Sequence, residues 1–170
     1  GLSPLREVLD VMELRTGIEI EAAGLAAERA SPAQLRRIVE CFEAGTGTPL
    51  WRHGYRSQFV DPYGYNNGPR ASPVIEHGAV YTVGAQAQLH CLDLGTGKLI
   101  WKRDLQKEYR VRQDFFGTAS TPLIEGQLLI VNVGAPGGPC VVGLDKTTGR
   151  EVWRAGQDWG PSYASPVPAV

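Results

Sequence analysis

The sequence CLDLGTGKLIW at residues 91–101 decides the fold, because it returns twice more in the chain. Two further copies, CFEAGTGTPLW at 41–51 and GLDKTTGREVW at 143–153, align with it without gaps. Between them a second motif recurs, as ASPVIEHGAVYTVG at 71–84, ASTPLIEGQLLIVNVG at 119–134 and ASPVPAV at 164–170. A period of about 50 residues is typical of a repeat protein in which each unit is one small supersecondary structure.

The residues that recur in the first motif have structural roles. An acidic side chain can cap the turn, a threonine adds a hydroxyl bond, a glycine supplies positive φ, and a tryptophan offers a flat surface for packing. Alternation in residues 79–83 and the apolar run at 128–131 predict the strands. The predicted structural docking residues are Trp51, Asp93, Thr96, Gly97, Trp101, Asp145, Thr148, Gly149 and Trp153.

The pattern Asp-x-x-Thr-Gly-x-x-x-Trp resembles the tryptophan-docking motif of pyrroloquinoline quinone (PQQ)-like β-propellers, and the resemblance runs from 41 to 170. That family includes quinoprotein dehydrogenases and the outer-membrane-protein assembly lipoprotein. The resemblance implies a mainly β fold, with about two and a half four-stranded blades in a domain at 44–170. Within 71–170 we expect two consecutive sheets, the second incomplete, with Trp101 packed between them. It also implies an extracytoplasmic, periplasmic location, although the sequence shows no signal peptide.

The first segment follows a different pattern. Apolar residues at helical spacing fill residues 5–25, and Ser31-Pro32-Ala33-Gln34 is a helix-start signature, so we expect a helical hairpin whose second helix runs from Pro32 to Glu43. Residues 2–44 resemble the start of the FCD ligand-binding domain of GntR-type transcription regulators. We therefore expect a separate domain at 1–43, and we favour a fusion of two fragments over an excerpt of one longer propeller.

Composition excludes several function classes. The formal net charge is −1, so no polyanionic partner such as nucleic acid is indicated. No apolar run is long enough to span a bilayer. The spacings of Cys41, Cys91 and Cys140 match no zinc or redox motif, so we expect free thiols and no metal site.

Three loops carry the candidate binding residues. The lead-in loops, defined here as residues 63–73, 115–122 and 159–166, precede the innermost strand of each predicted blade. In a propeller such loops converge at one mouth of the central channel. The predicted ligand-binding residues, which suit a protein or a small polar ligand, are Tyr65, Asn67, Arg70, Phe116, Trp159 and Tyr163.

Our functional hypothesis is a non-catalytic binding or scaffold module. The chain has no adjacent Cys-Cys pair, which quinone-binding relatives have, so PQQ and calcium are cofactors only by resemblance. Two alternatives stay open: part of a PQQ-dependent quinoprotein dehydrogenase, and an effector-binding fragment of a GntR-type regulator. We also expect self-association, either through the helices or through open blade edges.

Overall fold

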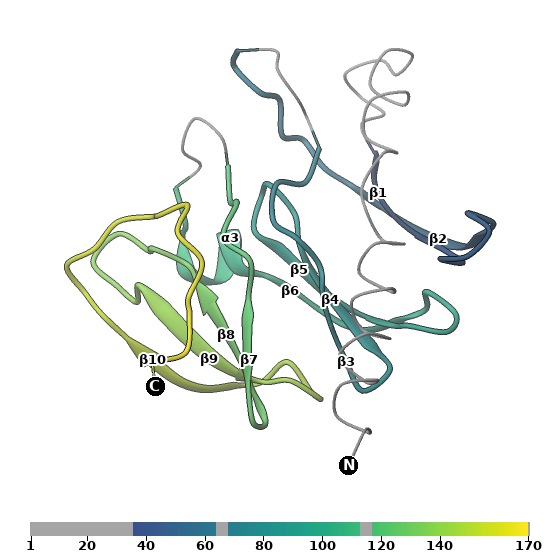
Figure 1. Cartoon of the computed structure of the whole chain (residues 1–170). Coiled ribbons are helices and arrows are strands. Elements are labelled where there is room, and N and C mark those ends of the chain that lie inside the picture. The colour runs from purple at the N-terminus through teal and green to yellow at the C-terminus, as the bar shows by residue number, and fades with distance from the viewer. Residues whose placement is uncertain (1–35, 64–67, 113–116, 170) are drawn as a thin grey trace.

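The computed structural model describes residues 36–63, 68–112 and 117–169, which form three antiparallel sheets in chain order (Figure 1). The chain is mainly β and has the fold of a partial propeller. Most of the predicted helical hairpin lies outside the described residues. No helix within the described ranges is both long and apolar enough to cross a membrane.

The first sheet is a two-stranded half-blade of β1 (Arg36–Phe42) and β2 (Pro49–Arg56). The helix predicted from Pro32 to Glu43 is therefore wrong over β1. Antiparallel pairing sets Cys41 opposite Trp51. The Glu43 carboxylate closes the turn by accepting from the backbone N–H groups of Gly45 (3.1 Å) and Thr46 (2.6 Å). The helix-start signature reflects only the local preference of residues 31–34. The backbone hydrogen bonds between β1 and β2 form only when the two strands pair, and they favour the strand.

The second sheet is a complete blade in the order β3 (Val74–Glu76), β4 (Ala79–Val83), β5 (Gln88–Asp93) and β6 (Leu99–Asp104). His77 and Gly78 join β3 to β4 with φ values of 45° and 78°, the signs that a two-residue type I′ hairpin turn requires. A short helix, α3 (Leu105–Tyr109), follows β6. Its Tyr109 hydroxyl donates to Glu151 Oε2 in the next sheet at 2.5 Å, which ties the two blades together.

The third sheet contains β7 (Leu123–Glu125), β8 (Leu128–Asn132), β9 (Val141–Asp145) and β10 (Glu151–Ala155). It has all four strands, so the expectation that it is incomplete is wrong. The outer strand forms because β10 pairs with β9 immediately after the Asp145 turn. The described chain therefore contains two complete blades and half of a preceding one.

The core lies between the two complete blades, which stand side by side in Figure 1. One continuous cluster of buried side chains draws on both sheets, so the faces of neighbouring blades pack against each other. Its fully buried members include Leu89 and Cys91 from β5, Leu129 and Val131 from β8, and Val142 and Leu144 from β9. This packing holds the loops at the ends of the strands in place.

Candidate functional site

Trp51 joins the half-blade to the second sheet. Its indole Nε1 donates to the Leu94 carbonyl at 2.7 Å, and its ring lies over Gly97. A Cβ at Gly97, whose φ is 67°, would lie 2.4 Å from the indole. A glycine is therefore required at this position both for the turn and for the close approach of the ring.

Trp101 repeats this geometry at the next junction. Its Nε1 donates to the Lys146 carbonyl at 3.0 Å, and a Cβ at Gly149 would lie 2.7 Å from its ring. Trp153 instead lies against Gly143, its partner in the β9–β10 ladder. The junctions fix how each blade is placed relative to the next, and so where the loops come together.

The turns beneath the tryptophans are closed by aspartates. Asp93 Oδ1 accepts from Thr96 N at 2.8 Å and from Thr96 Oγ1 at 2.6 Å. Asp145 Oδ1 accepts the equivalent pair from Thr148, each at 2.7 Å. Hydrogen bonds from the threonine hydroxyl and then the backbone lower the pKa of both carboxyl groups.

The lead-in loops are joined to one another by hydroxyl groups. Ser72 N donates to Thr121 Oγ1 at 3.0 Å, and Thr121 N donates to Ser165 Oγ at 2.9 Å. Ser120 Oγ also donates to the Ala164 carbonyl at 3.0 Å. The three Ala-Ser-(Thr)-Pro segments therefore lie side by side.

Arg70, one of the predicted binding residues, belongs to a buried ion pair. Its Nη2 donates to Asp61 Oδ2 at 2.6 Å, and the Asp61 side chain has no exposed surface. The guanidinium carbon lies 5.6 Å from the centre of the Phe59 ring, which is also fully buried. These contacts show that Arg70 stabilises its own loop. This role was not predicted from the sequence, because Asp61 was not considered as a partner of Arg70.

The remaining predicted binding residues are only partly described. Trp159 and Tyr163 are 68% and 47% exposed. Cys140 anchors the loop of Trp159, because its Sγ accepts from Trp159 N at 3.3 Å and donates to the Trp159 carbonyl at 2.8 Å. Tyr65, Asn67 and Phe116 lie outside the described residues.

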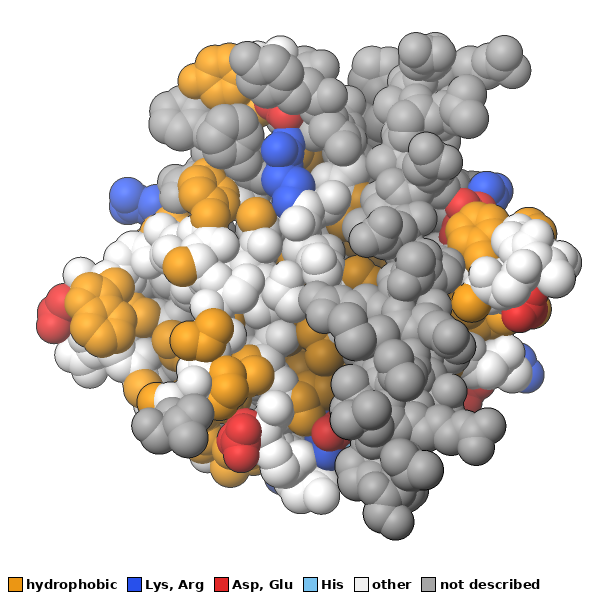
Figure 2. Space-filling view, in the orientation of Figure 1, with side chains coloured by type: hydrophobic (Ala, Val, Ile, Leu, Met, Phe, Trp, Pro, Cys, Tyr) orange, Lys and Arg blue, Asp and Glu red, His pale blue; other side chains and the backbone are white. Residues whose placement is uncertain are grey.

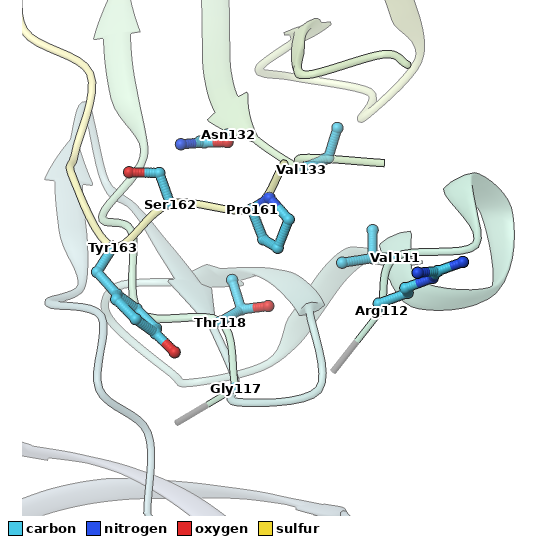
Figure 3. A pocket seen from close by; sticks show the side chains of 9 residues that line it. All are labelled: Val111, Arg112, Gly117, Thr118, Asn132, Val133, Pro161, Ser162 and Tyr163. Atoms are coloured by element: carbon cyan, nitrogen blue, oxygen red, sulfur yellow. The ribbon is translucent and has the colours of Figure 1, made fainter. Parts of the chain in front are cut away.

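A small pocket opens where two lead-in loops meet the end of β8. Figure 3 shows Tyr163 at one end and Arg112 at the other, with Pro161 and Thr118 between them. Hydroxyl groups, an amide and a guanidinium beside apolar side chains suit a polypeptide or a small polar group. Thr118 could have been predicted as a pocket residue from its position in the 115–122 loop. Asn132 gave no such signal, because it ends an apolar strand. The pocket is lined by Val111, Arg112, Gly117, Thr118, Asn132, Val133, Pro161, Ser162 and Tyr163.

The repeats match a known family along most of the chain. The family described as outer membrane protein assembly factor BamB matches residues 36–169. The chain belongs to this family. The match begins at the first residue of β1, and these findings give no support to the FCD-type resemblance, to a transcription regulator or to a fusion.

Individual relatives agree with the family match. BamB of Xanthomonas campestris pv. campestris is 34% identical over 88 residues, which are 52% of this chain and 21% of that protein. The structure of BamB from Moraxella catarrhalis aligns with a TM-score of 0.54 at 18% identity, over 75% of this chain and 36% of that one. The chain thus spans about a fifth of the length of the curated relative that it matches.

Quinoproteins share the fold. Quinohemoprotein alcohol dehydrogenase from Comamonas testosteroni aligns with a TM-score of 0.51 at 21% identity, over 69% of this chain and 18% of that one. At this identity the likeness concerns the fold alone.

PQQ and calcium are cofactors of this chain by resemblance only, because the features that would hold them are not found among the described residues. Cys41, Cys91 and Cys140 are free, buried and placed on separate segments, so no two are adjacent. Among residues 36–63, 68–112 and 117–169, no group of three His, Cys, Asp or Glu side chains is placed to hold a metal ion. We derive no chemistry through either group.

Proposed function

We propose that this chain is part of an outer membrane protein assembly factor and acts as a non-catalytic binding module in the periplasm. The family match over residues 36–169 is the observation that carries the proposal. The family and its Xanthomonas relative are outer membrane protein assembly factors, which supports this location and a partner among the proteins of outer membrane assembly.

The face formed by the lead-in loops is the proposed contact surface. Three aromatic side chains there are about half or more exposed: Tyr63 at 55%, Trp159 at 68% and Tyr163 at 47%. Aromatic residues are enriched in protein interfaces and carry much of their binding energy. On the face seen in Figure 2, hydrophobic side chains of the described residues lie in patches between white and charged atoms, which suits a partly polar, non-obligate contact.

An exchange experiment tests the proposed role. Residues 36–169 replace the corresponding blades of Xanthomonas campestris BamB, and outer membrane protein levels are measured in a strain that lacks its own BamB. We expect the chimaera to restore these levels, because this chain supplies equivalent blades. A chimaera that folds and is exported but restores nothing would overturn the proposal.

Surface variants of the same chimaera test the contact face. Replacing Tyr63, Trp159 and Tyr163 by serine should abolish restoration while the chimaera stays folded. The matched control replaces Leu50, Ile100 and Val152 by serine. These residues are 53–60% exposed on the outer strands, so the control chimaera should retain function. Equal restoration by both variants would place the contact elsewhere.

The dehydrogenase alternative has a direct assay. The purified chain is supplied with PQQ and calcium, and reduction of an electron-accepting dye is followed with primary alcohols as substrates. We expect no alcohol-dependent reduction. Turnover above the cofactor-only blank would replace the binding proposal by an enzymatic one.

A further inference from the structure

Two histidine rings meet across the junction between the half-blade and the second sheet. His53 on β2 and His90 on β5 have ring centres 5.5 Å apart. Tyr55, two residues along β2, lies 4.4 Å from the same His90 ring. His90 is only 3% exposed, whereas His53 is half-buried. These three rings are called here the histidine junction.

The charge next to His90 in the sheet is positive. In the sheet register His90 lies between Thr82 of β4 and Lys102 of β6. On β1, Val39 is opposite His53 and Arg37 is opposite Tyr55. The acidic residue on the same face of β6 is Asp104, which pairs with Lys107 at 3.1 Å.

Neither histidine has an acidic partner to balance a proton. Among the described residues, His90 Nδ1 and Thr82 Oγ1 are buried without a hydrogen-bond partner, and no carboxylate pairs with His53 or His90. A positive charge on His90, which is 3% exposed, would lose its hydration and would also be repelled by the exposed Lys102.

The neutral form of both rings is therefore favoured while the junction is closed. Burial, followed by the charges of His53 and Lys102, lowers the pKa of His90 to about 4. Burial and Lys102 also lower the pKa of His53. A histidine exposed to water titrates near pH 6.5, so opening the junction takes up protons below that pH. The closed form is fully favoured above about pH 6.5 and loses stability as the pH falls from there towards 4.

We propose that the histidine junction is an acid-sensitive device, and that protonation of its two histidines separates the half-blade β1–β2 from the second sheet. The proposal stands on the facing rings, the burial of His90 with its unpartnered Nδ1, and the neighbouring Lys102, and it does not depend on the binding role proposed above. Its direct consequence is that the half-blade detaches while the junction at Trp101, which lacks such a pair, stays closed.

Two buried cysteines report on the two junctions separately. Cys41, 4% exposed, lies opposite Trp51 in the half-blade, whereas Cys91, 1% exposed, lies opposite Trp101 at the next junction. The full chain is treated with 4,4′-dithiodipyridine between pH 7.5 and 4.5, and each labelled cysteine is quantified by peptide mass spectrometry. The ratio of the Cys41 rate to the Cys91 rate cancels the pH dependence of the reagent.

We expect this ratio to rise at least tenfold between pH 7 and pH 5, because each histidine that titrates in the window contributes up to tenfold per pH unit. His90→Phe keeps an aromatic ring beside Tyr55 but cannot ionise, so it should remove most of the rise. His53→Gln, at the more exposed position, should remove part of the rise. It provides a second test of the proposal if His90→Phe does not fold. His77→Gln, which changes a histidine outside the junction, should behave like the parent.

A constant ratio in the parent chain would overturn the proposal. A rise that persists unchanged in both His53→Gln and His90→Phe would also overturn it, because other groups would then open the junction.

Discussion

At the scale of single residues, a glycine beneath a tryptophan decides how closely two blades approach. Gly149 and Gly126 both have positive φ, 71° and 56°, but only Gly149 has an indole against it. Gly97 lies against Trp51 in the same way, so two successive junctions have the same contact between a glycine and an indole. Substitutions can therefore separate the backbone role of the glycine from its packing role.

We predict that Gly126→Ala costs about 1 kcal/mol, the usual penalty for a side chain at positive φ. Gly149→Ala should cost about 2–4 kcal/mol, because the methyl group also collides with Trp101. Urea unfolding of the two variants measures both values. Equal costs would show that the indole can move aside and that the close approach is not important.

The indole itself is the second test at this scale. Trp101 is half-buried and donates to the Lys146 carbonyl at 3.0 Å, so Trp101→Ala should cost about 3 kcal/mol, the lower end of the 3–5 kcal/mol typical of large aromatic deletions. Trp159→Ala removes an indole that is 68% exposed and should change stability little. A negligible cost for Trp101→Ala would contradict the docking role assigned to this tryptophan.

At the scale of elements, the turns that precede the outer strands carry a pH dependence of their own. Hydrogen bonds from Thr96 and Thr148 lower the pKa of Asp93 and Asp145 below the ordinary 3.8. The stabilisation is therefore present above pH 3.8 and is lost as the pH falls through the lower folded-state value. This window lies below the one in which the histidine junction titrates.

Replacing both turn aspartates by asparagine should reduce the fall in unfolding free energy below pH 4, since the amide oxygen still accepts but no longer titrates. Thermal unfolding followed by circular dichroism at pH 2.5–5 measures the effect. Asp158→Asn alters an exposed aspartate after β10 and is the control. An acid sensitivity equal to that of the parent would mean that other carboxylates dominate it.

At the scale of the whole molecule, the half-blade matters because β2 presents Trp51, His53 and Tyr55 to the second sheet. Strand β1 pairs with β2 along its whole length, from Arg36 opposite Arg56 to Phe42 opposite Pro49. Isolated strands are not stable in water. The first junction therefore depends on residues that the helical interpretation had assigned to another domain.

Comparing chains that start at residue 36 and at residue 46 isolates the contribution of β1. We predict that the shorter chain loses several degrees of melting temperature and that Trp51 becomes exposed to a fluorescence quencher, because β2 has lost its hydrogen-bonding partner. Trp101 should stay protected in both chains. Identical melting and quenching would show that the half-blade is held by side-chain contacts alone.

The sequence by itself determined the repeat, its turns and the four strands of the second sheet, but it predicted as incomplete the third sheet, which has all four strands. Each of these is a local matter: the acidic residue, threonine and glycine of a turn act within a few residues, and alternation in 79–83 is visible without a partner. It also located the lead-in loops, since they precede each repeat. In the copy at 41–51, Glu43 stands where the other two copies have Asp93 and Asp145, and its carboxylate closes the turn as theirs do.

Only the tertiary structure decided what depends on residues distant in the chain. Residues 36–42 form a strand because they pair with β2. The helix-start signature at residues 31–34 carries no information about that partner. Arg70 forms an ion pair because folding buries Asp61 beside it. His53 contacts His90 because the half-blade packs against the second sheet. Burial and stacking arise when the sheets pack, so the charge state and role of these side chains could not be read from their own segments.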